Sequence, residues 1–116
     1  MRKPKFVIFT GSDGKYYYNL KAANGESIMT GRGYSSRHAV LHGIAHVMEN
    51  GLEEIRFTRK ISANEKPYFQ LRAKSGRVIG WSELYESRQG RDKGIKAVQR
   101  AVMHGRVMDL GPIAAL

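Results

Sequence analysis

Residues 17–25 of the chain read YYNLKAANG, and residues 68–76 read YFQLRAKSG. Residues 34–47 likewise resemble residues 85–98. Every matched pair, such as Tyr17 and Tyr68, is 51 positions apart in the sequence. A constant offset indicates one structural unit used twice. Each unit is too short to bury much surface alone. We therefore expect residues 1–116 to form a single compact domain, in which two repeats at about 5–51 and 56–102 share a core.

The residue pattern within each repeat predicts three strands followed by a helix. Alternating apolar residues and turn signals such as Asn24-Gly25 indicate strands. Val40, Ile44 and Val47 then recur at helical spacing, after a serine suited to cap the helix and before a stop at Asn50-Gly51. The predicted strands are 6–10, 16–23, 26–32, 55–61, 67–74 and 77–82, with a second helix at about 87–103, a closing strand at about 106–110 and a tail at 111–116. This pattern predicts the α+β class.

The connection between the repeats contains no linker, because Leu52 follows directly after the stop at Asn50-Gly51. We therefore expect Glu53–Ile61 to form one long strand that closes the first unit and opens the second.

The segments 20–26, 33–36 and 43–44, with their echoes at 71–76, 85–87 and 94–95, resemble the YegP-like family of small prokaryotic proteins. The resemblance implies tandem β-β-β-α-β units that share one antiparallel sheet, with both helices on one face. It also implies that the strand after each helix is exchanged between units. The chain differs from the family pattern at His42 and Lys93, where the family usually has Asn, and at Glu86, where it has Ser. The family carries no established activity, so the resemblance transfers no catalytic residue.

Composition excludes several classes of protein. The chain has 116 residues, 41% hydrophobic and 26% charged, and no cysteine, so a disulfide framework and a thiolate metal site are both impossible. The apolar run after the basic N-terminus is too short for a signal peptide or a membrane span. We expect a cytoplasmic protein without membrane contact.

The net charge of +10 favours a polyanionic partner, either DNA or RNA or an acidic protein surface. Solubility alone is the alternative explanation of this charge.

Strand alternation sorts the side chains of the second strand of each repeat into two faces. Tyr18, Leu20, Phe69 and Leu71 belong to the predicted core. The opposite face carries a tyrosine, an amide and a base in the same order twice: Tyr17, Asn19 and Lys21, then Tyr68, Gln70 and Arg72. Aromatic residues interleaved with amides and cations can stack bases and contact phosphates. The alternative is an ordinary polar sheet surface with cross-strand tyrosine pairs.

Other residues have weaker functional interpretations. The second helix is predicted to present a basic stripe to solvent, formed by Arg88, Arg91, Lys93, Lys96 and Arg100. The first helix carries His38, His42 and His46 at a spacing that allows metal binding, although an ordinary exposed face explains them better. Parity places Trp81 in the core with Ile79 and Ile28, and Gly43 and Gly94 are expected to let each helix approach the sheet closely.

No nucleophile elbow, phosphate loop or metal-hydrolase helix occurs in the sequence. We therefore expect a non-enzymatic binding module without a cofactor, monomeric or homodimeric, with nucleic acid as the leading ligand. The alternative is a module for protein–protein contact or homo-association.

Overall fold

The computed structural model describes residues 3–109. The order of elements repeats, as the sequence predicts: three strands and a helix, twice, followed by one strand. The elements are β1 (Lys5–Thr10), β2 (Tyr16–Lys21), β3 (Ser27–Thr30), α1 (Arg37–Asn50), the 3-10 helix η1 (Glu54–Arg56), β4 (Phe57–Ile61), β5 (Pro67–Arg72), β6 (Val78–Ser82), α2 (Arg88–His104) and β7 (Arg106–Asp109). The α+β class is confirmed. Leu110, predicted to end the closing strand, and the predicted tail at 111–116 lie outside the described residues.

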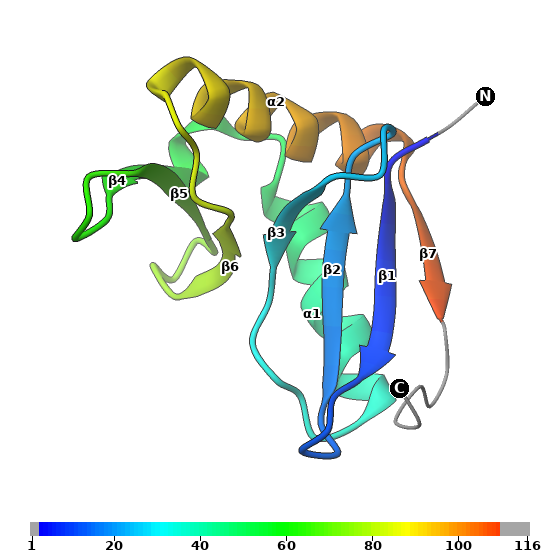
Figure 1. Ribbon diagram of the computed structural model, residues 1–116. Coiled ribbons are helices and arrows are strands. Elements are labelled where there is room, and N and C mark those ends of the chain that lie inside the picture. The colour runs from blue at the N-terminus through cyan, green and yellow to red at the C-terminus, as the bar shows by residue number, and fades with distance from the viewer. Residues whose placement is uncertain (1–2, 110–116) are drawn as a thin grey trace.

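All seven strands form one sheet in the order β4-β5-β6-β3-β2-β1-β7 (Figure 1). Neighbouring strands are antiparallel except β1 and β7, which are parallel. The sheet is therefore mixed, and the expectation of a purely antiparallel sheet needs correction at this one pair. The reason is the predicted strand exchange, since β7 follows the helix of the second repeat but pairs with the first strand of the first repeat.

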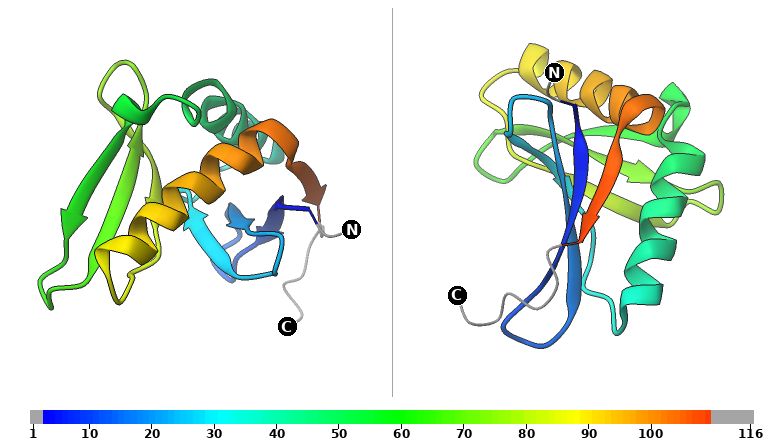
Figure 2. Two further views of the ribbon diagram at one scale, coloured as in Figure 1. Left: turned by 90° about the horizontal axis from the view of Figure 1, so that it is seen from above. Right: turned by 90° about the vertical axis from the view of Figure 1, so that its right-hand side faces the viewer.

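The two repeats meet where β3 pairs with β6. Thr30 lies opposite Trp81, which is its own counterpart 51 residues later, and Met29 lies opposite Ser82. The sheet twists strongly at this seam, so that in the right-hand view of Figure 2 β1, β2 and β7 run upright while the strands of the second repeat run across them. The twist allows each helix to contact strands of both repeats: α1 contacts β2, β5 and β6, and α2 contacts β3 and β5.

A serine caps each helix. The Ser36 hydroxyl accepts a hydrogen bond from the backbone N–H of Ala39 at 3.0 Å, and the Ser87 hydroxyl accepts one from Gly90 at the same distance. These caps satisfy N–H groups that the helix itself leaves unpaired. Ser87 therefore caps α2, although Glu86 occupies the preceding position, where the family pattern has Ser.

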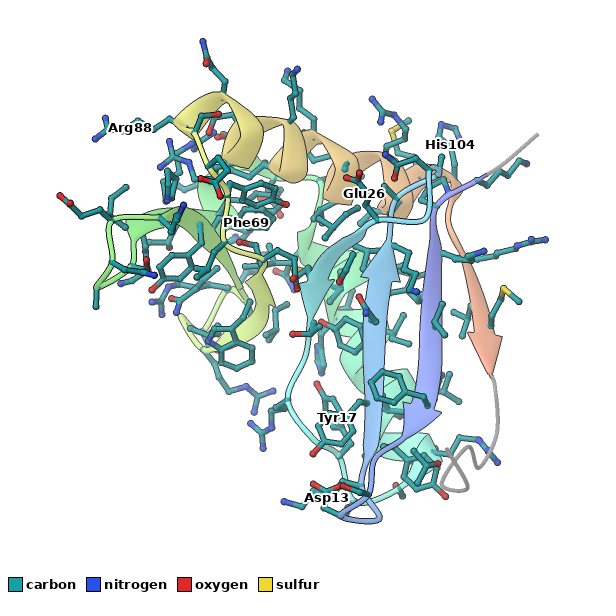
Figure 3. The ribbon with its side chains drawn as sticks, viewed as in Figure 1. Asp13, Tyr17, Glu26, Phe69, Arg88 and His104 are labelled. Carbon is teal, nitrogen blue, oxygen red and sulfur yellow. The ribbon has the colours of Figure 1, made fainter. Side chains whose placement is uncertain are left out.

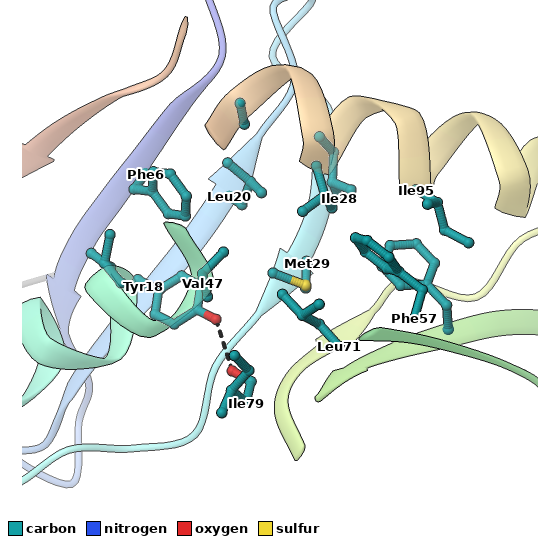
Figure 4. Packing of buried hydrophobic residues seen from close by; sticks show 14 of the residues in the cluster. Phe6, Tyr18, Leu20, Ile28, Met29, Val47, Phe57, Leu71, Ile79 and Ile95 are labelled. Atoms are coloured by element: carbon teal, nitrogen blue, oxygen red, sulfur yellow. Dashed lines mark hydrogen bonds between the residues drawn. The ribbon is translucent and has the colours of Figure 1, made fainter. Parts of the chain in front are cut away.

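The apolar faces of both helices and the sheet form one core. Phe6, Tyr18, Leu20, Phe69 and Leu71 are completely buried. Figure 4 shows the one polar link drawn within this cluster, in which the Tyr18 hydroxyl donates to the carbonyl of Ile79 at 3.1 Å. Because this bond joins β2 to β6, the core of the first repeat is completed by the second.

The prediction of one long strand over Glu53–Ile61 is wrong. The chain continues to turn after α1, because the N–H of Glu53 donates to the carbonyl of Asn50 and residues 54–56 form η1. β4 then pairs only with β5, at the edge of the sheet. Arg59 fixes this connection by pairing with Glu54 at 2.7 Å and with Asp92 of α2 at 2.9 Å.

Within residues 3–109, no helix has the length and apolar character needed to cross a membrane.

Candidate nucleic-acid interface

The predicted alternation on β2 and β5 is confirmed. Tyr18 and Leu20 are fully buried, as are Phe69 and Leu71, and the residues between them are partly exposed on the side of the sheet away from the helices. We call this side the open face. It carries the six residues predicted for it, namely Tyr17, Asn19, Lys21, Tyr68, Gln70 and Arg72.

Tyr17 is held in place at both ends of its side chain. Its ring stacks on Phe9 with centroids 5.7 Å apart, and its hydroxyl donates to the carboxylate of Asp13 in the β1–β2 turn (Figure 3). This hydrogen bond lowers the pKa of Asp13 and raises that of Tyr17. The ring is thus preorganised, and its orientation needs little further ordering to stack on a planar ligand.

In the second repeat, Arg72 organises the polar residues around it. Its guanidinium donates to the Thr58 hydroxyl at 3.2 Å, to the Gln70 side-chain oxygen at 3.1 Å and to the carbonyl of Gly76 at 2.7 Å. These contacts orient the Gln70 amide, whose nitrogen can still donate. Arg72 therefore acts first as a positioning group. In the first repeat, the Asn19 side-chain oxygen accepts from the Ser27 hydroxyl at 2.6 Å.

Trp81 lies on the open face, and its predicted place in the core is wrong. A β-bulge causes the difference: Val78 pairs with Arg72 but Gly80 pairs with Leu71, so Ile79 is an extra residue and the alternation shifts by one. Trp81 therefore lies opposite Gln70 on one side and Thr30 on the other, and it is half-buried.

The register also places on the open face two cations that sequence reasoning missed, Lys5 and Arg106. Lys21 lies opposite Lys5, and Lys5 lies opposite Arg106 on β7. These three residues form a basic row across β2, β1 and β7. The sequence alone cannot reveal it, because the row depends on the parallel pairing of β7 with β1.

The basic stripe of α2 is only partly as predicted. Arg88, Lys93, Lys96 and Arg100 are exposed, and Figure 3 shows Arg88 at the beginning of α2, away from the sheet. Arg91 is buried, with only 8% of its surface exposed, and its Nε contacts the Asp92 carboxylate at 3.2 Å. The prediction that Arg91 faces outward is therefore wrong. Because α2 belongs to the helix layer, its stripe and the open face lie on opposite sides of the sheet.

The three histidines of α1 do not converge. The rings of His38 and His42 are 4.5 Å apart, whereas His46 is directed to Glu49, with Nδ1 3.8 Å from a carboxylate oxygen. Among the residues that the structure describes, no group of three or more His, Asp or Glu side chains is placed to hold a metal ion.

Comparisons with known proteins identify relatives over most of the chain. The family described as "Domain of unknown function (DUF1508)" matches twice, at residues 12–56 and 62–109, in agreement with the two repeats. A UPF0339 protein of Acinetobacter baylyi is 41% identical over 105 residues, which cover 90% of this chain and 95% of that protein. The UPF0339 protein YegP of Escherichia coli is 38% identical over 94 residues, covering 81% and 86%.

Two solution structures have the same fold. That of YegP superposes with a TM-score of 0.87 at 34% identity and covers 95% of both chains. That of a UPF0339 protein from Shewanella oneidensis superposes with a TM-score of 0.85 at 33% identity, covering 93% of this chain and 92% of the other.

Proposed function

The chain belongs to the DUF1508 family, and we propose that it is a non-enzymatic basic module that binds single-stranded nucleic acid on the open face. The observation that carries the proposal is the arrangement of partly exposed aromatic residues, Tyr17, Tyr68 and Trp81, on one sheet surface among amides and cations. Aromatic rings on a sheet stack with unpaired bases, whose faces are accessible only when the strand is single.

The amides are positioned to read the edges of stacked bases. Gln70 and Asn19 lie in one cross-strand row with Trp81 and Thr30 between them. Arg72 donates a hydrogen bond to the side-chain oxygen of Gln70, and Ser27 donates one to that of Asn19. The amide nitrogens of Gln70 and Asn19 are therefore directed away from these donors and can themselves donate to a base. A base stacked on Trp81 would meet an amide on either side along this row.

The basic row supplies the electrostatic part of the interaction. Lys5, Lys21 and Arg106 lie on the open face toward its β7 edge, at the end of β1 and β2 opposite Tyr17. The phosphate backbone of a strand that continues past Asn19 would pass there. Each neutralised phosphate releases counterions, so the affinity should fall steeply as salt rises.

Trp81 allows a direct test, since it is the single tryptophan of the chain. Titration with a short oligonucleotide, either dT or rU, at about 50 mM salt should quench its fluorescence, with binding followed in parallel by anisotropy of a labelled strand. One stacked base contributes about 1 to 3 kcal/mol. Trp81→Thr, which installs the counterpart residue Thr30, should therefore weaken binding about 5- to 150-fold, and Tyr17→Ala with Tyr68→Ala should weaken it further.

The matched control replaces Arg88, Lys96 and Arg100 of α2 by alanine, which removes three charges from the opposite side of the sheet. This triple variant should lower the affinity modestly and leave the quenching intact. If it abolishes binding while Trp81→Thr does not, α2 and not the open face is the interface. If neither DNA nor RNA binds the folded protein at 50 mM salt, the nucleic-acid proposal is wrong.

In that last case, protein contact becomes the better candidate, because Leu52 and Ile55 between α1 and β4 are 51% and 81% exposed. Both belong to the same connection, and contiguous exposed apolar surface is typical of contact surfaces.

A further inference from the structure

A pocket of about 320 Å³ lies between α1 and the beginning of β6. Its volume is at the lower end of the range for small-molecule sites, about 300 to 1,000 Å³. The polar residues that line it are Arg32, Tyr34, His42, His46 and Arg77, and Val78 and Ile79 provide an apolar wall. None of the six candidate residues of the open face lines this pocket.

The charged residues of the lining, Arg32 and Arg77, are both basic. Two arginines and two histidines face the same space, and no residue described as lining it carries a carboxylate. Arg32 and Arg77 are exposed, and within residues 3–109 neither guanidinium has a carboxylate within 4.0 Å. Burial raises the pKa of Tyr34, and both guanidiniums oppose this shift, which places both charges close to its hydroxyl.

The second repeat contains the equivalent pocket with different charges. A pocket of about 360 Å³ lies between α2 and β3, lined by Tyr85, Lys93, Gly94 and Ala97 together with Glu26 and Ile28. Each of these residues is 51 positions from a residue that lines the first pocket, and the counterpart of Glu26 is Arg77. Among the residues that line the second pocket, Glu26 thus replaces Arg77, Lys93 replaces His42 and Ala97 replaces His46. The counterpart of Arg32 is Glu83, which does not line the second pocket.

Both repeats form a pocket at the same place, so its shape is a property of the repeat fold. Its charge differs between the repeats. Burial, with a smaller contribution from the charges of Glu83 and Glu26, raises the pKa of Tyr85 to about 12, whereas the arginines lower the pKa of Tyr34. A generally basic composition would affect both pockets alike. The second pocket has one lysine, Lys93, beside the carboxylate of Glu26, whereas the first has two arginines and no carboxylate. The excess of positive charge is therefore specific to the first pocket.

We propose that the pocket between α1 and β6 binds a small phosphate monoester with an apolar body. The guanidinium groups of Arg32 and Arg77 match the geometry of a phosphate dianion, and the imidazoles of His42 and His46 and the Tyr34 hydroxyl supply further donors. Val78 and Ile79 accommodate the apolar part. This inference is independent of nucleic-acid binding on the open face.

Phenyl phosphate is a suitable probe, titrated into the isotopically labelled full chain and followed by the backbone amide signals in NMR spectra. The signals of Gly43 and Ile79 should shift with a saturating curve, whereas those of Gly94 in the second pocket should not. Inorganic phosphate should bind more weakly than phenyl phosphate, since it lacks the apolar part. Phenol should not saturate the site.

Arg77→Glu, which installs the residue of the second repeat, should weaken binding of phenyl phosphate at least about tenfold, because charge-assisted hydrogen bonds are lost and a repulsive charge is gained. Arg32→Gln should also weaken it, without adding a negative charge. Lys3→Glu changes the net charge as much as Arg77→Glu does, but at an exposed position before β1, and should alter the affinity less than twofold.

Unchanged melting temperatures verify that the variants are folded. The proposal is wrong if Arg77→Glu and Lys3→Glu weaken binding equally, if phenol binds as well as phenyl phosphate, or if the signals of Gly43 and Ile79 do not respond to millimolar phenyl phosphate at low salt.

Discussion

At the scale of single residues, Gly43 and Gly94 show how close packing is achieved in both repeats. The sequence predicts that these glycines let each helix approach the sheet closely. The structure shows that each glycine packs against the tyrosine of the loop before its helix, Tyr34 or Tyr85, and not against strand backbone. A Cβ atom at Gly94 would lie 2.7 Å from Cζ of Tyr85 and 3.2 Å from Cε2 of Phe69. Neither group is the end of a flexible side chain.

Gly94→Ala should therefore lower the free energy of unfolding by about 1 to 3 kcal/mol, the usual cost of overpacking a core. Gly90→Ala in the same helix is the matched control, since its Cβ would meet nothing closer than 3.4 Å and alanine is the better helix former. It should leave the protein equally or more stable. Urea unfolding of both variants measures this, and equal effects of the two substitutions would contradict the packing argument.

At the scale of elements, the sequence predicts each helix and almost every strand, because hydrophobic period and turn residues are local signals. It does not predict where the alternation shifts. The bulge at Ile79 depends on how β6 pairs with β5, and it moves Trp81 from the expected core to the open face. The same bulge occurs in the first repeat, where Ile28 is the extra residue between β3 and β2. Each bulge makes two adjacent residues of its strand buried, at 28–29 and 79–80, where regular alternation would bury only one of them.

The last strand, β7, stabilises the fold mainly through its backbone hydrogen bonds. Val107 and Met108 are 40% and 37% exposed, so pairing with β1 is its main contact with the sheet. Removing residues 105–116 should lower the free energy of unfolding by about 1 to 3 kcal/mol through the lost ladder hydrogen bonds. It should also leave the edge of β1 open to pairing with other chains.

Light scattering and thermal unfolding test this, with a chain that ends at Asp109 as the control that keeps β7. The shorter chain should associate with further copies of itself at concentrations where the oligomeric state of the control does not change. If both chains behave alike, β7 does not protect the edge of β1.

At the scale of the whole molecule, three tyrosines couple the stability of the fold to pH. Burial raises the pKa of Tyr18, Tyr34 and Tyr85, the last to about 12. In the unfolded chain a tyrosine ionises near pH 10. Because the folded state holds these groups neutral, their stabilisation is complete below pH 10 and is lost as pH rises above it, by up to about 1.4 kcal/mol per pH unit for each tyrosine.

Urea unfolding between pH 9 and 11 should therefore show stability falling above pH 10. Tyr18→Phe should cost about 1 kcal/mol at neutral pH, since the bond to the Ile79 carbonyl is lost, and it should make the alkaline decline shallower. A decline of unchanged slope in Tyr18→Phe would show that Tyr18 does not contribute to it.

The candidate sites are formed by residues that are distant in the sequence and that only the whole fold brings together. Sequence reasoning therefore found them incompletely. The face of Tyr17 and Tyr68 follows from local alternation and was predictable. The basic row of Lys5, Lys21 and Arg106 joins the two ends of the chain, and the pocket between α1 and β6 joins a helix of one repeat to a strand of the other. Neither is visible before the fold is known.

The pairing of Thr30 with Trp81 places equivalent positions of the two repeats opposite each other, so a twofold axis passes through this point of the seam. A chain of one repeat carries both halves of such a contact, and two copies of it can pair as a symmetric dimer with the six strands β4-β5-β6-β3-β2-β1. Duplication and fusion of the gene turn that dimer into one polypeptide. In a single polypeptide, unlike a symmetric dimer, the two pockets can carry different residues, as Arg77 and Glu26 do here.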